Sequence, residues 1–179
     1  MTDVPRRPSR EEVLAAEGAK VPDVIAPGLT ILFCGINPGL YSGAVGHHFA
    51  RPGNRFWKAL AGSGLTRGEV SPFDERTLLQ RGIGITNLVG RATARADELT
   101  PVELRGGLGA LTVKARRYGP RYVAMLGIGA YRTAFGRREA ELGPRPETVG
   151  GVRLWLLPNP SGLNAHYSVD DLSRLFADL

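Results

Sequence analysis

The sequence predicts a three-layer α/β/α sandwich around a mainly parallel sheet of about four to five strands. The first observation is a set of four short apolar runs, at Thr30–Cys34, Ile83–Val89, Tyr122–Leu126 and Val152–Leu157. These runs are continuous rather than alternating, which is typical of strands covered on both faces. Helical patterns lie between them, and strands that alternate with helices indicate parallel pairing. A chain of 179 residues suits one domain with a substantial core.

The N-terminal segment is polar and rich in Pro and Arg. Residues 1–10 are predicted to be a disordered tail, so that residues 11–179 form the single domain. Glu11–Ala19 favours a short helix, which Gly18 and Pro22 end. The first residues lack the pattern of a signal peptide, and no apolar run approaches the roughly 20 residues of a membrane span. We therefore expect a cytoplasmic protein with no membrane partner.

Three further helices are indicated by their start signals and apolar faces. One is predicted to open near Asn54, with Phe56 and Trp57 on its buried side. Thr100-Pro101-Val102-Glu103 combines a Thr N-cap, Pro at the first helical position and a capping Glu. The last is capped by Ser168 and carries one apolar stripe, formed by Leu172, Leu175, Phe176 and Leu179.

The charge balance points to a polyanionic partner. The chain carries 23 Lys and Arg against 17 Asp and Glu, for a net charge of +6. Most of the excess is arginine, whose planar guanidinium pairs well with phosphate. Nucleic acid is the first partner to consider, and a merely soluble basic protein is the alternative. The single cysteine, Cys34, excludes an intrachain disulfide and a Cys-rich metal site, and its apolar setting favours a structural thiol.

Two predicted strands end in similar loops, Gly35-Ile36-Asn37-Pro38-Gly39 and Pro158-Asn159-Pro160-Ser161-Gly162. In open α/β sheets, ligands bind beyond the carboxyl ends of the strands. Parallel strands bring both loops to one edge, so Asn37 and Asn159 are predicted to face one pocket. Each Asn precedes a Pro, which stiffens the loop, and an amide both donates and accepts hydrogen bonds. One such loop alone would be an ordinary turn, whereas two at matching positions favour a site.

Other segments near these loops allow more than one interpretation. Tyr41–Phe49 is rich in glycine and can approach a ligand, and Phe49 is either a stacking face for a base or a core aromatic. His47 and His48 are adjacent and diverge, so no metal site is predicted. Arg51–Lys58 mixes cations and aromatics at a helix start, and Arg55 and Lys58 are candidate phosphate contacts. Gly127-Ile128-Gly129 is a weak phosphate-loop signal.

Three motifs in order, Gly35–Gly39, Phe49–Lys58 and Asn159–Leu163, resemble the mismatch-specific uracil-DNA glycosylase and thymine-DNA glycosylase family. The resemblance runs from about Ala26 to the C-terminus. It implies a monofunctional glycosylase of base excision repair, with no metal or cofactor. Such an enzyme flips uracil, and by extension thymine or related damaged pyrimidines, out of G·U and G·T mispairs. It hydrolyses the N-glycosidic bond and leaves an abasic site.

The same resemblance implies roles for individual residues. Asn37 would position the water that attacks the sugar C1′, and Phe49 would stack on the flipped base. Ile36 and Ser42 would line the base pocket, and Asn159 would lie near the scissile bond. Ser161, Gly162 and Leu163 would form the wedge that fills the hole left in the duplex. The expected partner is double-stranded DNA with uracil or a mispaired base, and the expected state is a monomer.

Two departures from the family pattern lead to further expectations. Asn164-Ala165 follows the wedge where bacterial members often carry Arg, so contacts to the strand opposite the lesion are expected to differ and product release to be faster. Asn37 cannot take a proton from water, and Asp97 lies in the loop after the second strand. We predict Asp97 as the missing general base, and an exposed loop carboxylate is the alternative.

Two other functions fit the same fold. A DNA- or nucleotide-binding module without catalysis would bind mispairs but form no abasic sites. A small-molecule enzyme with phosphate at Gly127–Gly129 would need no duplex and would show weak salt dependence. If the protein is a DNA glycosylase, its binding to DNA should weaken as salt rises, because phosphate contacts release counterions.

Overall fold

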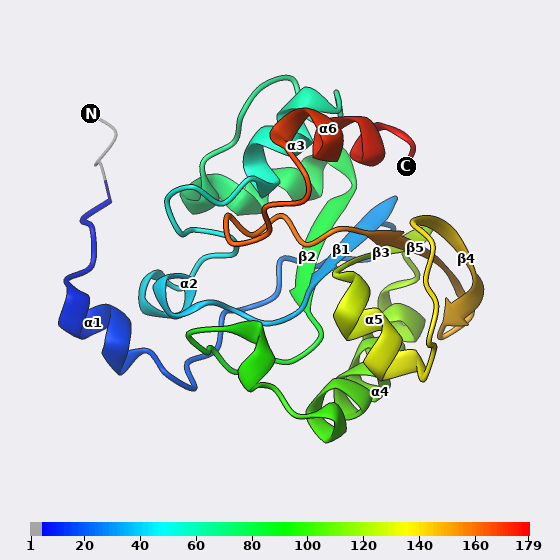
Figure 1. Ribbon diagram of the computed structural model, residues 1–179. Helices are drawn as coiled ribbons and strands as arrows, with labels where there is room; N and C mark the ends of the chain where they lie inside the picture. Colours follow the sequence, from blue (N-terminus) through cyan, green and yellow to red (C-terminus); the bar gives the residue numbers. More distant parts are fainter. Residues whose placement is uncertain (1–4) are drawn as a thin grey trace.

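The computed structural model describes residues 5–179, so the first four residues of the predicted tail lie outside the described part. A five-stranded sheet in the order β2-β1-β3-β5-β4 forms its centre (Figure 1). The strands are β1 (Ile31–Gly35), β2 (Ile83–Asn87), β3 (Tyr122–Leu126), β4 (Gly143–Val149) and β5 (Val152–Leu157). All neighbours pair in parallel except β4, which runs antiparallel to β5. The four predicted strands are thus confirmed, with boundaries that differ by at most two residues.

Helices cover both faces of this sheet, as the sequence predicted. Helices α3 (Phe56–Gly62) and α6 (Val169–Ala177) pack against each other on one face (Figure 1). Helices α4 (Pro101–Tyr118) and α5 (Ile128–Phe135) pack together on the other. The predicted α/β/α sandwich is therefore confirmed. None of the helices in residues 5–179 is both long and apolar enough to cross a membrane.

The capping residues act as their sequence patterns predicted. Thr100 accepts a hydrogen bond from the Glu103 amide, and the Glu103 carboxylate bonds back to the Thr100 amide. Ser168 caps α6 in the same reciprocal way with Asp171. The apolar stripe of α6 then buries Phe176 fully in the core.

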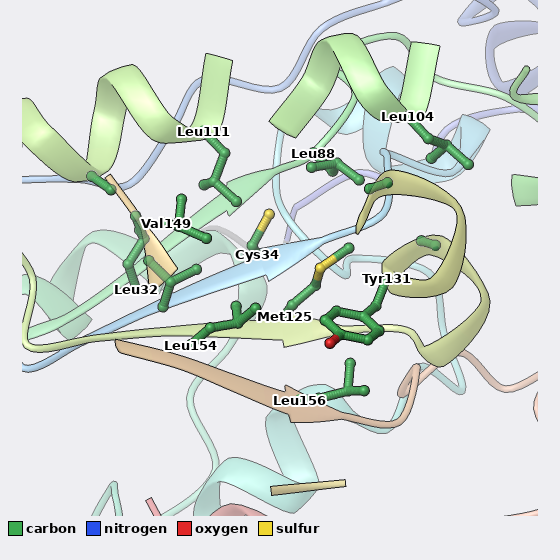
Figure 2. Close-up of a cluster of buried hydrophobic side chains, with 14 of the residues drawn as sticks. Leu32, Cys34, Leu88, Leu104, Leu111, Met125, Tyr131, Val149, Leu154 and Leu156 are labelled. Carbon is green, nitrogen blue, oxygen red and sulfur yellow. The ribbon is translucent and has the colours of Figure 1, made fainter. Parts of the chain in front are cut away.

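Each sheet face has its own apolar core. Figure 2 shows the core between the sheet and helices α4 and α5, where Leu32, Leu111 and Met125 meet. Cys34 is fully buried in the same cluster, and this burial raises the pKa of its thiol to about 12. Cys34 is therefore protonated at neutral pH and serves in packing. It is not a nucleophile, because only the thiolate form reacts.

Several elements differ from the sequence prediction. Helix α1 spans Arg10–Ala15 and is capped by Ser9, so it begins one residue earlier and ends earlier than expected. Helix α2 (Leu40–Val45), which was not predicted, occupies part of the glycine-rich segment Tyr41–Phe49. Pro72–Arg81 forms an unpredicted 3₁₀ segment. Strand β4 was not located because it is an edge strand, with exposed prolines and two part-buried charged residues in place of an apolar run.

Candidate active site

The carboxyl ends of β1 and β5 meet at one edge of the sheet, as the two Asn-Pro loops predicted. Asn37 follows β1 and Asn159 follows β5, and both line one cavity of about 120 Å³. We call this the small cavity. Phe49 and Ser42 line it too. The structure therefore brings together Asn37, which was predicted to hold the attacking water, and three residues that were predicted for the base pocket.

The orientation of the Asn37 amide is fixed by its partners. Its Nδ2 donates to the Arg91 carbonyl at 2.9 Å and to Thr93 Oγ1 at 2.7 Å. The Arg91 carbonyl can only accept, so it must face the NH₂ group rather than the oxygen. Both Nδ2 hydrogens are thereby used. The amide oxygen of Asn37 is left as the group that can accept a hydrogen bond in the small cavity.

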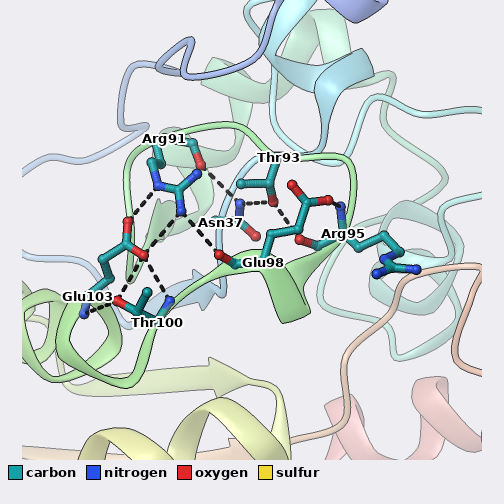
Figure 3. A network of polar contacts seen from close by, with 7 residues as sticks. All are labelled: Asn37, Arg91, Thr93, Arg95, Glu98, Thr100 and Glu103. Atoms are coloured by element: carbon teal, nitrogen blue, oxygen red, sulfur yellow. Dashed lines mark hydrogen bonds and ion pairs between the residues drawn. The ribbon is translucent and has the colours of Figure 1, made fainter.

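An ion pair supports the backbone that holds Asn37 (Figure 3). The Arg91 guanidinium contacts the Glu103 carboxylate through two bonds, Nε–Oε1 at 2.5 Å and Nη2–Oε2 at 3.1 Å. The hydrogen bonds from Arg91, and then those from Thr100, lower the pKa of Glu103 to about 2. Because the pKa of Glu103 is lower in the folded state than its ordinary value of 4.5, the ion pair stabilises the fold fully at a pH above about 4.5. This stabilisation is lost as the pH falls toward 2. The support for Asn37 is thus charged throughout the neutral range.

The Asn159 amide is oriented in the opposite sense. Its Oδ1 accepts a hydrogen bond from the Ser161 amide at 3.0 Å. A backbone N–H can only donate, so Oδ1 must face it, and Nδ2 remains as the donor group. Asn164 Nδ2 also donates to the Asn159 carbonyl at 3.1 Å, which ties this loop together. The small cavity therefore receives an acceptor from Asn37 and a donor from Asn159.

This pair of amides suits the hydrolysis of a bond to a departing anion. An amide oxygen can accept a hydrogen bond from a water molecule and hold its lone pair toward an electrophilic carbon. An N–H donor fixed in a cavity stabilises negative charge as it develops on a leaving group. The two amides lie in short Asn-Pro loops, each two residues beyond the end of a sheet strand. Strands β1 and β5 therefore fix where both loops begin.

Phe49 lies in the small cavity in an unusual backbone conformation. Its φ is +51°, the left-handed region that costs a non-glycine residue about 1–3 kcal/mol. Hydrogen bonds on both sides hold it there: the His48 amide donates to Glu75 at 2.8 Å, and the Ala50 amide donates to Ser42 Oγ at 3.0 Å. Buried Ser42 thus fixes the loop beside Phe49 as well as lining the cavity.

The Phe49 ring packs between the end of β1 and helix α3. It stacks on Phe56 with centroids 4.3 Å apart and planes inclined by 27°. A Cβ at Gly35 would lie 3.2 Å from Phe49 Cζ and 2.6 Å from Asn87 Oδ1. Gly35 is therefore required for both side chains to reach the cavity. The part of the Phe49 ring that is not covered lines the small cavity.

Sequence reasoning missed Asn87 and His48, which also line the small cavity. His48 Nε2 bonds the Pro22 carbonyl at 2.9 Å, so it carries the proton, and Asn87 Nδ2 donates to His48 Nδ1 at 3.3 Å. Burial lowers the pKa of His48, which agrees with a neutral ring. The signal for Asn87 was an amide at the end of an otherwise apolar strand. Its carboxamide can both donate to and accept from the edge of a pyrimidine.

The predicted wedge forms the rim between three hollows in the surface. Leu163 is 66% exposed and lines the small cavity, a larger cavity of about 1030 Å³ and a third beside Gly53. Ile36 lines both the small and the large cavity. An exposed leucine on a loop between surface hollows is the feature expected of a side chain that enters a base stack.

The structure separates Asp97 from Asn37. Asp97 lines the large cavity and not the small one, its side chain is 69% exposed, and Oδ1 accepts from Arg95 Nε at 3.1 Å. Its loop does leave the predicted sheet edge, since Arg95 and Ala96 line both cavities. In this arrangement Asp97 is an exposed, paired carboxylate, and Asn37 donates its hydrogen bonds to other residues, Arg91 and Thr93.

The prediction that Arg55 contacts phosphate is not supported by its geometry. Its two Nη atoms donate to the backbone carbonyls of Ser161, Asn164 and Tyr167, in the loop that carries the wedge. Those bonds direct both Nη atoms at the protein backbone. Lys58 is exposed on the same helix and remains a candidate phosphate contact.

The other sequence candidates do not form a metal centre. His47 Nδ1 lies 3.0 Å from Glu75, while the His48 ring points to Pro22. The two histidines thus diverge as predicted. Over residues 5–179, no group of three or more His, Cys, Asp or Glu side chains is arranged to hold a metal ion.

Comparison with known proteins agrees with this geometry. The family model of the uracil DNA glycosylase superfamily matches residues 22–179. A solution NMR structure of a candidate uracil DNA glycosylase from Methanosarcina acetivorans has a similar fold, with a TM-score of 0.61 and 19% identity over 89% of this chain and 94% of that chain. That similarity concerns the fold alone, whereas the family match covers nearly the whole domain. The chain therefore belongs to the uracil DNA glycosylase superfamily.

Proposed function

We propose that this protein is a monofunctional, mismatch-specific uracil- and thymine-DNA glycosylase that acts in base excision repair. One observation carries the proposal: Asn37 and Asn159 present an acceptor and a donor to the same cavity, beside the ring of Phe49. Family membership supports DNA glycosylase chemistry. The specificity for G·U and G·T mispairs rests on the resemblance of the three motifs.

The reaction begins with extrusion of the target base. A base within a duplex cannot be reached, and flipping it out costs a few kcal/mol, less for a wobble mispair. Leu163, exposed at the rim of the small cavity, would fill the vacated space and offset the lost stacking. Selectivity for mispairs would arise in part from the lower cost of extruding a base that is already poorly paired.

The extruded base would then enter the small cavity and stack on Phe49. Asn87 would bond the polar edge of the pyrimidine. The Asn37 oxygen would hold the attacking water below the sugar C1′. As the glycosidic bond breaks, its electron pair moves to the base, and the Asn159 NH₂ would stabilise the anion. The water oxygen then bonds to C1′, and the proton that it loses passes to the departing base or to solvent. No metal or cofactor takes part in this scheme.

The contribution of Asp97 stays a prediction. A carboxylate in the large cavity would have to leave Arg95 and turn toward the small cavity in order to act on the same water. If it does so when DNA binds, it would extend excision to A·U pairs and single strands. Asp97→Asn would remove the proposed general base without changing the size of the side chain. If Asp97 acts on the water, this variant should slow excision from A·U pairs and single strands more than excision from G·U.

The test is single-turnover excision from labelled DNA that carries G·U, G·T, A·U or single-stranded uracil, with alkali to reveal abasic sites. Wild type should release uracil from G·U fastest, and Asn37→Ala should lose about 100-fold or more of that rate. Asp97→Asn run beside them reports on the general base. Binding of mispairs without an abasic product from any substrate would refute the enzyme and favour a non-catalytic DNA-binding module.

A further inference from the structure

Arg55 connects the start of helix α3 with the wedge loop, more than 100 residues later in the chain. Its Nη2 donates to the Ser161 carbonyl at 2.6 Å and also to the Asn164 carbonyl, and its Nη1 donates to the Tyr167 carbonyl. The Arg55 amide donates to the Pro160 carbonyl at 3.1 Å. One residue thus bonds four carbonyls of residues 160–167.

Arg55 is partly buried, and both of its Nη atoms donate to backbone carbonyls. Its Nε is buried and has no partner within residues 5–179. A buried nitrogen is out of reach of a phosphate group on bound DNA. The planar fork suits the observed arrangement, because it presents several N–H donors in fixed directions to several acceptors. A lysine carries its three donors on one nitrogen, so it cannot bond the loop from two separate nitrogens as Arg55 does.

The wedge loop is shaped by these bonds together with its own. The Asn164 amide donates to the Ser161 carbonyl at 2.9 Å, and the Leu163 amide to Ser161 Oγ at 3.3 Å. Gly162 packs closely on the turn that contains Gly53, since a Cβ at Gly162 would lie 3.0 Å from the Gly53 carbonyl oxygen. The carbonyls of the loop point inward to Arg55, and the Leu163 side chain is left outward.

We propose that Arg55 is a positioning residue that preorganises the wedge, so that Leu163 is already in place when the duplex arrives. This inference rests on the proposed function. A free loop would have to be ordered during insertion, and that entropy cost would be added to the barrier for base flipping. Arg55 acts through Leu163 and does not touch the reacting atoms.

The kinetic test compares Arg55→Met and Arg55→Lys with Arg67→Met, a control at an exposed arginine that lines none of the three cavities. On G·U duplex, both Arg55 variants should slow single-turnover excision roughly 10- to 100-fold, the size of a lost hydrogen bond to a charged group. Each should recover to within about threefold of wild type on a duplex with a pyrene nucleotide opposite uracil, because pyrene fills the space that the wedge otherwise fills.

Two results would overturn the positioning role while the glycosylase itself stands. A full rate with Arg55→Lys would indicate a simple charge, as at a phosphate contact. An equal loss on the G·U and pyrene duplexes would indicate a general defect. If the wild-type protein excised uracil from none of the substrates, that result would instead refute the proposed function.

A second measurement does not depend on activity. Amide hydrogen exchange should rise in residues 160–167 of Arg55→Met and Arg55→Lys and stay unchanged in the sheet strands, because the loop alone loses its anchor. Unchanged exchange in residues 160–167 would overturn the inference, whatever the kinetic result.

Discussion

Replacing Thr93 by valine tests how the active-site amide is held. Thr93 Oγ1 accepts from Asn37 Nδ2 at 2.7 Å and donates to the Arg95 carbonyl at 2.8 Å. The residue is buried, and valine has nearly the same shape, so Thr93→Val removes two hydrogen bonds and little else. Asn37 keeps only its bond to the Arg91 carbonyl and can rotate more freely.

The magnitude follows from the number of bonds. Each neutral hydrogen bond contributes about 0.5–1.5 kcal/mol, so two give a loss of about 1–3 kcal/mol in the free energy of unfolding. For a domain of this size, that lowers Tm by roughly 2–12 °C. Only the bond to Asn37 bears on catalysis, and its share corresponds to a roughly 2- to 13-fold slower single-turnover rate.

The assay is single-turnover excision from a G·U duplex with Thr93→Ser as the matched control. Thr93→Ser keeps the hydroxyl and should stay within about twofold of wild type. A Thr93→Val variant with lower Tm but an unchanged rate would refute the view that this bond orients Asn37. A loss beyond about 100-fold would show that Thr93 takes part in the chemistry directly.

Three further predictions concern the cavity and the DNA. Gly35→Ala brings a Cβ within 3.2 Å of Phe49 Cζ, so the free energy of unfolding should fall by about 1–3 kcal/mol in urea and excision should slow; no change in either would contradict the packing described. Burial lowers the pKa of His48 from 6.5, so the unfolded state binds more protons below that pH and stability falls as the pH drops from 7 to 5. In urea titrations His48→Gln should lose less stability over this range, and an identical pH slope would exclude the effect. Lys58→Ala should reduce the slope of log affinity against log salt by about 1 in anisotropy titrations, and an unchanged slope would exclude a phosphate contact.

The elements that position the small cavity were predictable because their signals are local. Apolar runs marked the buried strands, and the Thr100 and Ser168 patterns marked two helix starts. The Asn-Pro loops placed Asn37 and Asn159 at the same edge because parallel strands end together. These inferences need only the periodicity of each segment and the topology rule for parallel sheets.

The roles that depend on distant contacts could not be derived from the sequence. Arg55 resembles a surface cation in its local context, and its three carbonyl partners lie 106 to 112 residues away. The same holds for Asn87, whose neighbours in the cavity come from other loops. Asp97 was placed on the correct sheet edge, but its distance from Asn37 depends on how the Ala96–Glu98 turn folds.

The most direct test of the two-amide account compares leaving groups. Single-turnover excision of uracil and of 5-fluorouracil, each opposite guanine, would be measured for wild type, Asn37→Ala and Asn159→Ala. Fluorine stabilises the departing anion, so the loss caused by Asn159→Ala should be smaller for 5-fluorouracil than for uracil. The loss caused by Asn37→Ala should be the same for both bases, because that residue acts on the water. An equal loss for both bases with Asn159→Ala, or no loss with Asn37→Ala, would contradict the account.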